Sequence, residues 1–160
     1  TYGPLDWKVS EGEDRYRRSL YTFAKRTAPY ATFITFDGPS GEACTARREV
    51  SNTPLQALTL LNDMVFVEAA QQLGRRAAAL EGTDADRVRE LFRRCLTRPP
   101  EPVELDQLLA FVQQQRQRLS AGELKAAELA GPNSPNPAEC AAWTALARVL
   151  LSLDEAITKS

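Results

Sequence analysis

Four short stretches have the residue types that begin α-helices, and they constrain the fold more than any other feature of the sequence. Thr53-Pro54-Leu55-Gln56 places a hydroxyl at the N-cap, a proline at the first helical position and a glutamine at the third. The hydroxyl and the glutamine side chain then bond to N–H groups that lack a partner inside the helix. Asn136-Pro137-Ala138-Glu139 has the same arrangement, Thr83-Asp84-Ala85-Asp86 has it without proline, and Glu101-Pro102-Val103-Glu104 is a weaker version because glutamate is a poor cap. We therefore expect helices to begin at these four places.

Apolar residues recur three or four positions apart after each start, which is typical of a helix with one face in a core. The first segment runs from Pro54 to about Leu80, and we expect Asn62-Asp63 to interrupt it, with Asp63 capping a second helix. The expected apolar faces are Leu58, Leu61, Val65, Ala69 and Leu73; Val88, Leu91, Phe92 and Cys95; Leu105, Leu108, Leu109 and Val112; and Trp143, Leu146, Ala147, Leu150 and Leu151.

The first third of the chain has weaker signals. Residues 1–12 have the composition of an irregular segment, and Tyr16, Leu20 and Phe23 have helical spacing, so a helix is expected from about residue 13 to residue 26, ending before Pro29. Residues 32–36 are β-branched and aromatic, which favours a brief strand or extended segment. Turn-forming residues follow at 37–41.

Together these patterns predict an all-α fold. We expect a compact bundle of about five to six helices, with an irregular N-terminal segment and a long loop that contains at most one short strand. The 160 residues fit one domain, 1–160. Residues 121–136 are expected to form a flexible connector before the last helix, with a short polar helix within 121–130. No apolar run approaches the roughly 20 residues that a membrane-spanning helix needs.

Composition excludes several kinds of site. The chain has no histidine, which rules out a Ser-His-Asp triad, a Cys-His dyad and a histidine-containing zinc site within it. Cys44, Cys95 and Cys140 are far apart and show no metal-binding spacing; Cys95 and Cys140 fit helix faces, and a disulfide among the three stays open. We therefore expect no metal and no cofactor in this chain. No catalytic residue is identified, which leaves an enzymatic role open but favours a non-catalytic one.

The charges argue against nucleic-acid binding. Twenty basic residues are interleaved with 21 acidic ones, and the formal net charge is -1. All but four of the basic residues are arginine. Arginine favours fixed, bidentate pairs with carboxylates, so buried or interface ion pairs are one interpretation of this excess, and the codon usage of a GC-rich genome is the other.

The densest polar cluster is the candidate binding site. It consists of Asp37, Cys44, Arg47, Arg48, Asn52, Thr53 and Gln56. As a binding site, Arg47 and Arg48 would hold a carboxylate or sulfate beside the helix N-terminus at Thr53. As a scaffold, the same residues would cap the helix and pair with acids, and both interpretations stay open. A second basic group is expected to be solvated or ion-paired: Arg15, Arg17, Arg18, Lys25 and Arg26.

Three stretches resemble a known family when their order and spacing are taken together. They are RRSLYTF and KRTAP at 17–29; FD, CTARR, NTPLQAL and LLND at 36–63; and AW with LLSLDEAITK at 142–159. In this order they resemble the C-terminal part of a domain of unknown function in planctomycete secreted proteins, where it follows a cytochrome c module and a second uncharacterised domain. The family often has proline where this chain has Met64.

The resemblance implies a context rather than a reaction. It implies that the chain is a C-terminal fragment of a larger multidomain protein, exported to the periplasm or the cell surface, with haem only in a neighbouring domain. Two functional hypotheses follow. The first is a non-catalytic helical module that docks onto other domains of the same polypeptide or onto a protein partner. The alternative is part of an enzyme or binding site for acidic or sulfated glycans, with Arg47 and Arg48 as the anion grip.

Overall fold

The computed structural model describes residues 10, 12–22, 29–39, 44, 46–47 and 50–158. Within these residues the fold is all-α, as predicted, and contains no strand. The chain divides into two compact units, Thr1–Ser51 and Asn52–Ser160. The prediction of one domain over 1–160 stays a prediction, and each unit is described by itself below.

The described part of the first unit contains two 3-10 turns and one short helix, η1 (Gly12–Tyr16), η2 (Ser19–Tyr21) and α1 (Ala31–Thr35). The predicted helix from residue 13 to residue 26 is wrong over its described part, and residues 23–26 lie outside the described residues. Tyr16 and Leu20, expected on its apolar face, are exposed, so burial does not stabilise a longer helix there.

The brief strand or extended segment predicted at 32–36 is also wrong, because residues 32–35 belong to α1 and Phe36 is its C-cap. A strand needs a neighbour to satisfy its backbone, whereas a helical turn satisfies its own. Here the Phe36 N–H donates to the Thr32 carbonyl at 3.0 Å. The Tyr30 and Phe33 rings meet edge to face with centroids 5.3 Å apart, which adds a local aromatic contact.

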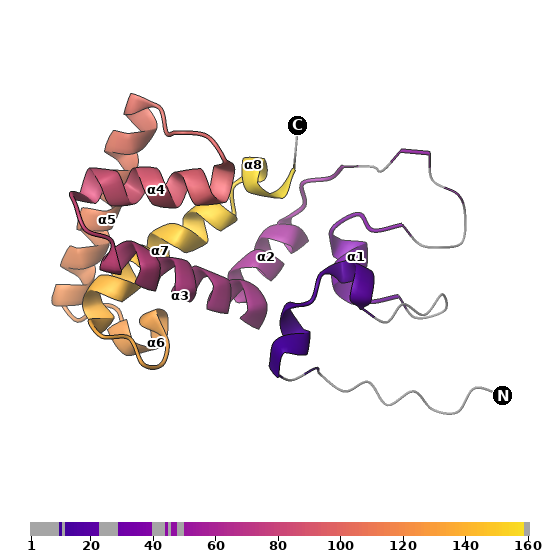
Figure 1. The fold of residues 1–160 in the computed structure, drawn as a ribbon, viewed down its shortest axis with the longest axis horizontal. Coiled ribbons are helices and arrows are strands. Elements are labelled where there is room, and N and C mark those ends of the chain that lie inside the picture. The colour runs from indigo at the N-terminus through magenta and orange to yellow at the C-terminus, as the bar shows by residue number, and fades with distance from the viewer. Residues whose placement is uncertain are drawn as a thin grey trace. The chain divides into compact units, whose positions relative to one another are not determined.

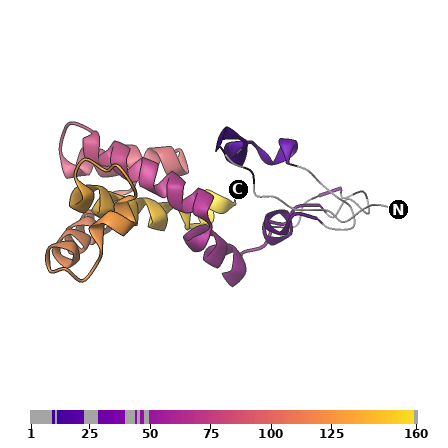
Figure 2. The ribbon, with the colours of Figure 1, turned by 90° about the horizontal axis from the view of Figure 1, so that it is seen from below.

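The second unit is a helical bundle, and Figures 1 and 2 show its helices from two sides. Its elements are α2 (Pro54–Asn62), α3 (Met64–Ala79), α4 (Asp84–Leu96), α5 (Pro102–Ser120), α6 (Ala126–Ala130), α7 (Pro137–Leu151) and α8 (Asp154–Ile157). All four predicted helix starts are confirmed, since α2, α4, α5 and α7 begin at the expected residues. The 121–136 segment contains α6, which is shorter than the helix expected within it.

Side-chain caps fix the starts of α2 and α3. The Gln56 amide N–H donates to Thr53 Oγ1 at 3.3 Å, and the Thr53 N–H donates to Gln56 Oε1 at 2.9 Å, which is the predicted capping box. The predicted break before Met64 is a clean one, with Asp63 extended (φ -66, ψ 133) and its Oδ1 accepting from the Val65 N–H at 2.9 Å. Figure 1 shows α2 and α3 running in different directions on either side of this residue.

The core of this unit is built around α7, which packs against α3, α4, α5, α6 and α8. Trp143, Leu146 and Leu150 are completely buried on it. The predicted faces of α4 and α5 are confirmed, with Val88, Leu91, Phe92 and Val112 in the same core and Leu105, Leu108 and Leu109 packed against it. No described helix is long and apolar enough to span a lipid bilayer.

The apolar face predicted along α2 and α3 is wrong in most of its members. Leu58, Leu61 and Val65 are exposed, and of the predicted set Leu73 packs against the core. The buried positions are instead Gln56 and Leu60 on α2 and Ala70, Gln71, Gly74 and Ala77 on α3. Because the helix breaks at Asp63, the 3.6-residue period does not continue from α2 into α3, so a single stripe drawn through both misplaces the buried face.

Small residues on α3 let its backbone approach α7 closely. A Cβ added to Gly74 would lie 2.6 Å from the Thr144 nitrogen and 2.8 Å from its Cα. Ala70 and Ala77 are likewise buried on α3. The absence of a side chain at Gly74 therefore sets the spacing of the two helices.

An arginine on α5 joins the starts of two other helices. The Arg116 guanidinium donates to Asp84 Oδ1 at 3.0 Å, at the start of α4, and to Glu139 Oε2 at 2.9 Å, in the first turn of α7. It also lies 5.7 Å from the centre of the Trp143 ring, whose N–H donates to Glu139 Oε1 at 2.7 Å. Hydrogen bonds from Arg116 are the main reason that the pKa values of Asp84 and Glu139 are lowered, against the opposing effect of burial.

We expect Gly74→Ala to destabilise the bundle. In an open helix this change stabilises by about 1 kcal/mol, but the new Cβ meets the Thr144 backbone, and overpacking of this kind costs about 1–3 kcal/mol. Urea unfolding measures the change, and Gln72→Ala, at an exposed position of α3, is the control that should be near neutral. A Gly74→Ala chain more stable than the unsubstituted one would contradict the close approach.

We expect Glu139→Gln to lower the free energy of unfolding at pH 7 by about 2 kcal/mol, as for other hydrogen bonds between charged groups. Because the pKa of Glu139 is lowered in the folded chain, its contribution is present above its ordinary value of 4.5 and is lost as the pH falls further. The difference between the two proteins should therefore be constant from about pH 6 to pH 8 and shrink towards pH 3.

Glu90→Gln is the matched control for this prediction. It breaks the more exposed pair between Glu90 and Arg94 (2.7 Å) within α4, and such surface pairs contribute about 1 kcal/mol or less. Urea unfolding at a series of pH values gives the comparison. An effect of Glu139→Gln that is no larger than that of Glu90→Gln would show that the network does not stabilise the bundle.

Candidate functional site

Asp37, the first residue of the predicted cluster, closes a loop. Its carboxylate accepts from the Ser51 N–H at 2.8 Å and from the Ser51 hydroxyl at 2.8 Å, so the two ends of the 38–50 segment are joined at their base. Asp37 has a positive φ of 55°, a conformation that aspartate tolerates better than most residues. The geometry here gives Asp37 a structural role.

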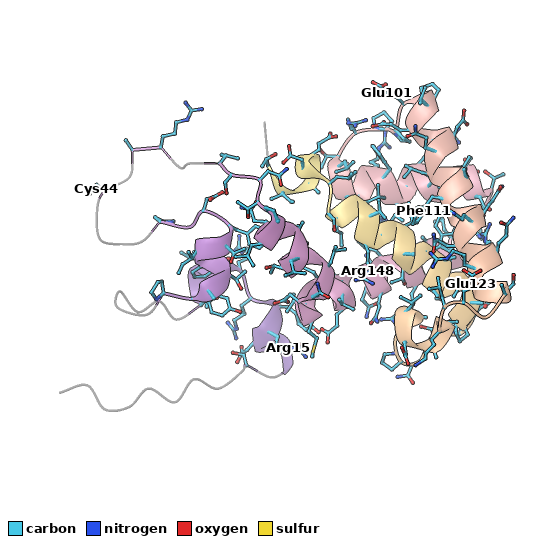
Figure 3. The ribbon with its side chains drawn as sticks, turned by 180° about the vertical axis from the view of Figure 1, so that it is seen from behind. Arg15, Cys44, Glu101, Phe111, Glu123 and Arg148 are labelled. Atoms are coloured by element: carbon cyan, nitrogen blue, oxygen red, sulfur yellow. The ribbon has the colours of Figure 1, made fainter. Side chains whose placement is uncertain are left out.

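Cys44 and Arg47 lie on this loop, where both are exposed, and Figure 3 shows the position of Cys44. Arg48, the second half of the predicted anion grip, lies outside the described residues. An exposed guanidinium such as that of Arg47 can meet an anion from solvent. The grip as a pair stays a prediction.

Asn52 and Gln56 belong to the second unit and have partners there. The Asn52 side-chain amide donates to Asp154 Oδ1 at 3.1 Å, and Gln56 is buried in the capping box with Thr53. Of the predicted site residues, the structure therefore brings Thr53 and Gln56 together and directs Asp37 and Asn52 to other partners.

The second basic group is engaged locally in its described part. Arg17 Nε lies 2.5 Å from Asp14 Oδ1, and Arg15 and Arg18 lie over the rings of Tyr16 and Tyr21. Lys25 and Arg26 lie outside the described residues. These contacts fit the interpretation of an ion-paired, solvated face.

Arg98, which the motif analysis did not single out, is the centre of a second ionic cluster. Its guanidinium donates two hydrogen bonds to Glu104 on α5 (2.8 and 2.9 Å) and two to Glu155 on α8 (2.7 and 2.8 Å). It also lies 4.9 Å from the centre of the buried Phe92 ring. Bonds from Arg98 and from the Glu101 N–H lower the pKa of Glu104 to about 2, and Arg98 also lowers the pKa of Glu155.

The arginine excess was the only sequence signal for these clusters. It indicated bidentate pairing in general, and Arg98 and Arg116 each make such pairs with two carboxylates. The partners come from helices that are distant in sequence, such as Glu155 for Arg98, so residue spacing alone could not identify them. In the described parts of the chain, no three Cys, Asp or Glu residues are placed to hold a metal ion.

Five apolar side chains are exposed on α2 and at the start of α3. We call them the α2–α3 apolar face, and they are Leu55, Leu58, Leu61, Met64 and Val65, with exposed fractions from 36% at Val65 to 63% at Met64. The sequence from Val50 to Asn62 contains no charged residue. Sequence periodicity found three of these residues but assigned them to the core.

Comparison with known proteins gives a family but no activity. Residues 3–112 match the PSD1 family, described as "Protein of unknown function (DUF1553)". No curated protein and no solved structure shows a significant match to the chain. Because the matched region covers well over half of the 160 residues, the chain belongs to this family of unknown function.

Proposed function

We propose that the chain is a non-catalytic helical module that docks through the α2–α3 apolar face onto an apolar surface of another domain of its own polypeptide. The exposure of Leu55, Leu58 and Met64 is the observation that carries the proposal. Leu55 and Leu58 lie three residues apart on α2 and are therefore neighbours on its surface, and adjacent exposed apolar side chains are typical of protein interaction sites. A separate protein that covers the same face is the competing outcome of the test.

The arrangement of polar groups supports the same function. The two most heavily bonded ionic clusters, around Arg98 and Arg116, bond to carboxylates that hold helices together. Their hydrogen-bonding capacity is therefore used within the bundle rather than offered to a substrate. The α2–α3 apolar face has a different character, because its α2 part carries no charged residue from Val50 to Asn62 and its five apolar side chains are exposed.

The proposed setting is an exported polypeptide that also carries a cytochrome c module, in the periplasm or at the cell surface. The support for this setting is the resemblance of the three sequence stretches. In this proposal the haem belongs to the neighbouring module and this chain contributes no cofactor ligand.

The alternative function, recognition of acidic or sulfated glycans, is favoured by one observation, the exposure of Arg47 on the loop closed by Asp37 and Ser51. Its test is the binding of a sulfated oligosaccharide to the chain with and without Arg47→Gln. Binding that is weakened by the substitution and by salt supports it, and equal binding by both proteins contradicts it.

Oxidation of Met64 tests the docking proposal directly. Met64 is the single methionine of the chain and is 63% exposed, so dilute peroxide should oxidise it rapidly in the isolated chain. In the complete polypeptide we expect oxidation to slow by about tenfold or more because docking excludes the reagent from a buried contact. Mass spectrometry of the peptide that contains Met64 measures both rates.

A methionine placed at Val103, which is 65% exposed on α5, is the matched control and should oxidise equally fast in both contexts. Leu58→Asp in the complete polypeptide should restore rapid oxidation of Met64, because a carboxylate is costly to bury in an apolar contact. Equal rates for Met64 in the isolated chain and the complete polypeptide would contradict the proposal. If Met64 is protected from oxidation only when another protein is added, the partner is that protein and not a domain of the same polypeptide.

A further inference from the structure

We propose that α8 is a clasp, a short helix whose bonds hold the residue before the α2 cap to the α4–α5 turn, and that it thereby controls the position of Leu55 and Leu58 in the α2–α3 apolar face. The clasp stands on contacts within the bundle. Its control of docking rests on the proposed function.

One side of α8 bonds to the residue that precedes the α2 cap. Asp154, the first residue of α8, accepts a hydrogen bond from the Asn52 side chain across 102 positions of sequence. Asn52 is followed directly by Thr53, the N-cap of α2. The bond therefore ties α8 to the N-terminal end of α2.

The next residue of α8 bonds in another direction. Glu155 accepts two hydrogen bonds from Arg98, which holds Glu104 at the start of α5 with two more. Arg98 also lies over the Phe92 ring, and Ala156 packs against the main core. Adjacent residues of one short helix thus join α2 to the turn between α4 and α5.

The size of α8 makes these contacts decisive for its position. It has four residues and no fully buried side chain, and a helix of this length is not stable without contacts to other parts of the protein. Exposed ion pairs and hydrogen bonds are individually weak. Opening of α8 therefore requires the loss of these hydrogen bonds and of the Ala156 contact, while the helices of the core stay packed.

At its other end α2 is held by α7. Arg148 Nη2 donates to the Leu61 carbonyl at 2.6 Å, near the α2 C-terminus, and Arg148 is labelled in Figure 3. Leu60 is buried near the same end. Release of the clasp would leave this end fixed and loosen the N-terminal half of α2, where Gln56 is the single fully buried residue and Leu55 and Leu58 are exposed.

Amide hydrogen exchange of the chain tests the clasp without reference to docking. Asp154→Ala and Arg98→Gln should each accelerate exchange in α2 by about two- to fivefold, as expected for loss of a surface contact, and leave the amides of α7 unchanged. Glu90→Gln, which breaks a pair within α4, should change neither helix. No acceleration in α2, or equal acceleration in α2 and α7, would overturn the clasp.

Met64 oxidation in the complete polypeptide tests control of docking. We expect Asp154→Ala to reduce the protection of Met64 by about twofold or more, in proportion to the freed population of α2. If amide exchange in α2 becomes faster while the protection of Met64 from oxidation is unchanged, α8 holds α2 but does not control docking. If Met64 is not protected in the unsubstituted polypeptide, the proposed function fails. The amide exchange rates of α2 then test on their own whether α8 holds α2 in place.

Discussion

The close approach of α3 and α7 is the constraint on which the rest of the second unit depends. Gly74 has no side chain, so the two backbones come close together near Thr144. Ala70 and Ala77, which are also small, are buried on α3 as well. With this contact in place, α7 can bury Trp143 and the leucines of its other faces against α4 and α5. A larger residue at the contact would displace the helix that every other core element touches, which costs more than the added apolar area contributes.

Arginine side chains hold the helix ends, which apolar packing alone does not fix. Core contacts hold the middle of the helices, whereas their ends carry unpaired backbone groups and fewer apolar neighbours. Arg116 joins the start of α4 to the start of α7, and Arg98 joins the start of α5 to α8. Planar guanidinium groups suit this role because one side chain can serve two carboxylates with paired hydrogen bonds. The bundle thus uses its most strongly bonded charges to fix helix ends.

Local signals in the sequence were sufficient for some features and insufficient for others. The caps at Thr53, Thr83 and Asn136 involve residues within one helical turn, so the sequence predicted all three and also the break at Asp63. The orientation of α2 was not predictable in this way. Leu58 and Leu61 have core-like spacing, but which face is buried depends on the direction of α2 relative to α3 and on the contact of Arg148 with the Leu61 carbonyl. The candidate site was predicted only in part for a similar reason. The partner of Asn52 is Asp154, which is distant in sequence, so residue spacing could not identify this contact.

The exposed leucines of α2 are the proposed interface with another domain. The most heavily bonded polar clusters bond within the bundle, whereas Leu55 and Leu58 are exposed on a helix that carries no charged residue. Photo-crosslinking from position 58 is the most direct measurement, with a benzophenone side chain in place of Leu58 and, as the control, in place of Val103. We expect crosslinks from position 58 to residues outside this chain and few from position 103. Equal or absent crosslinking from position 58 would contradict the proposed interface.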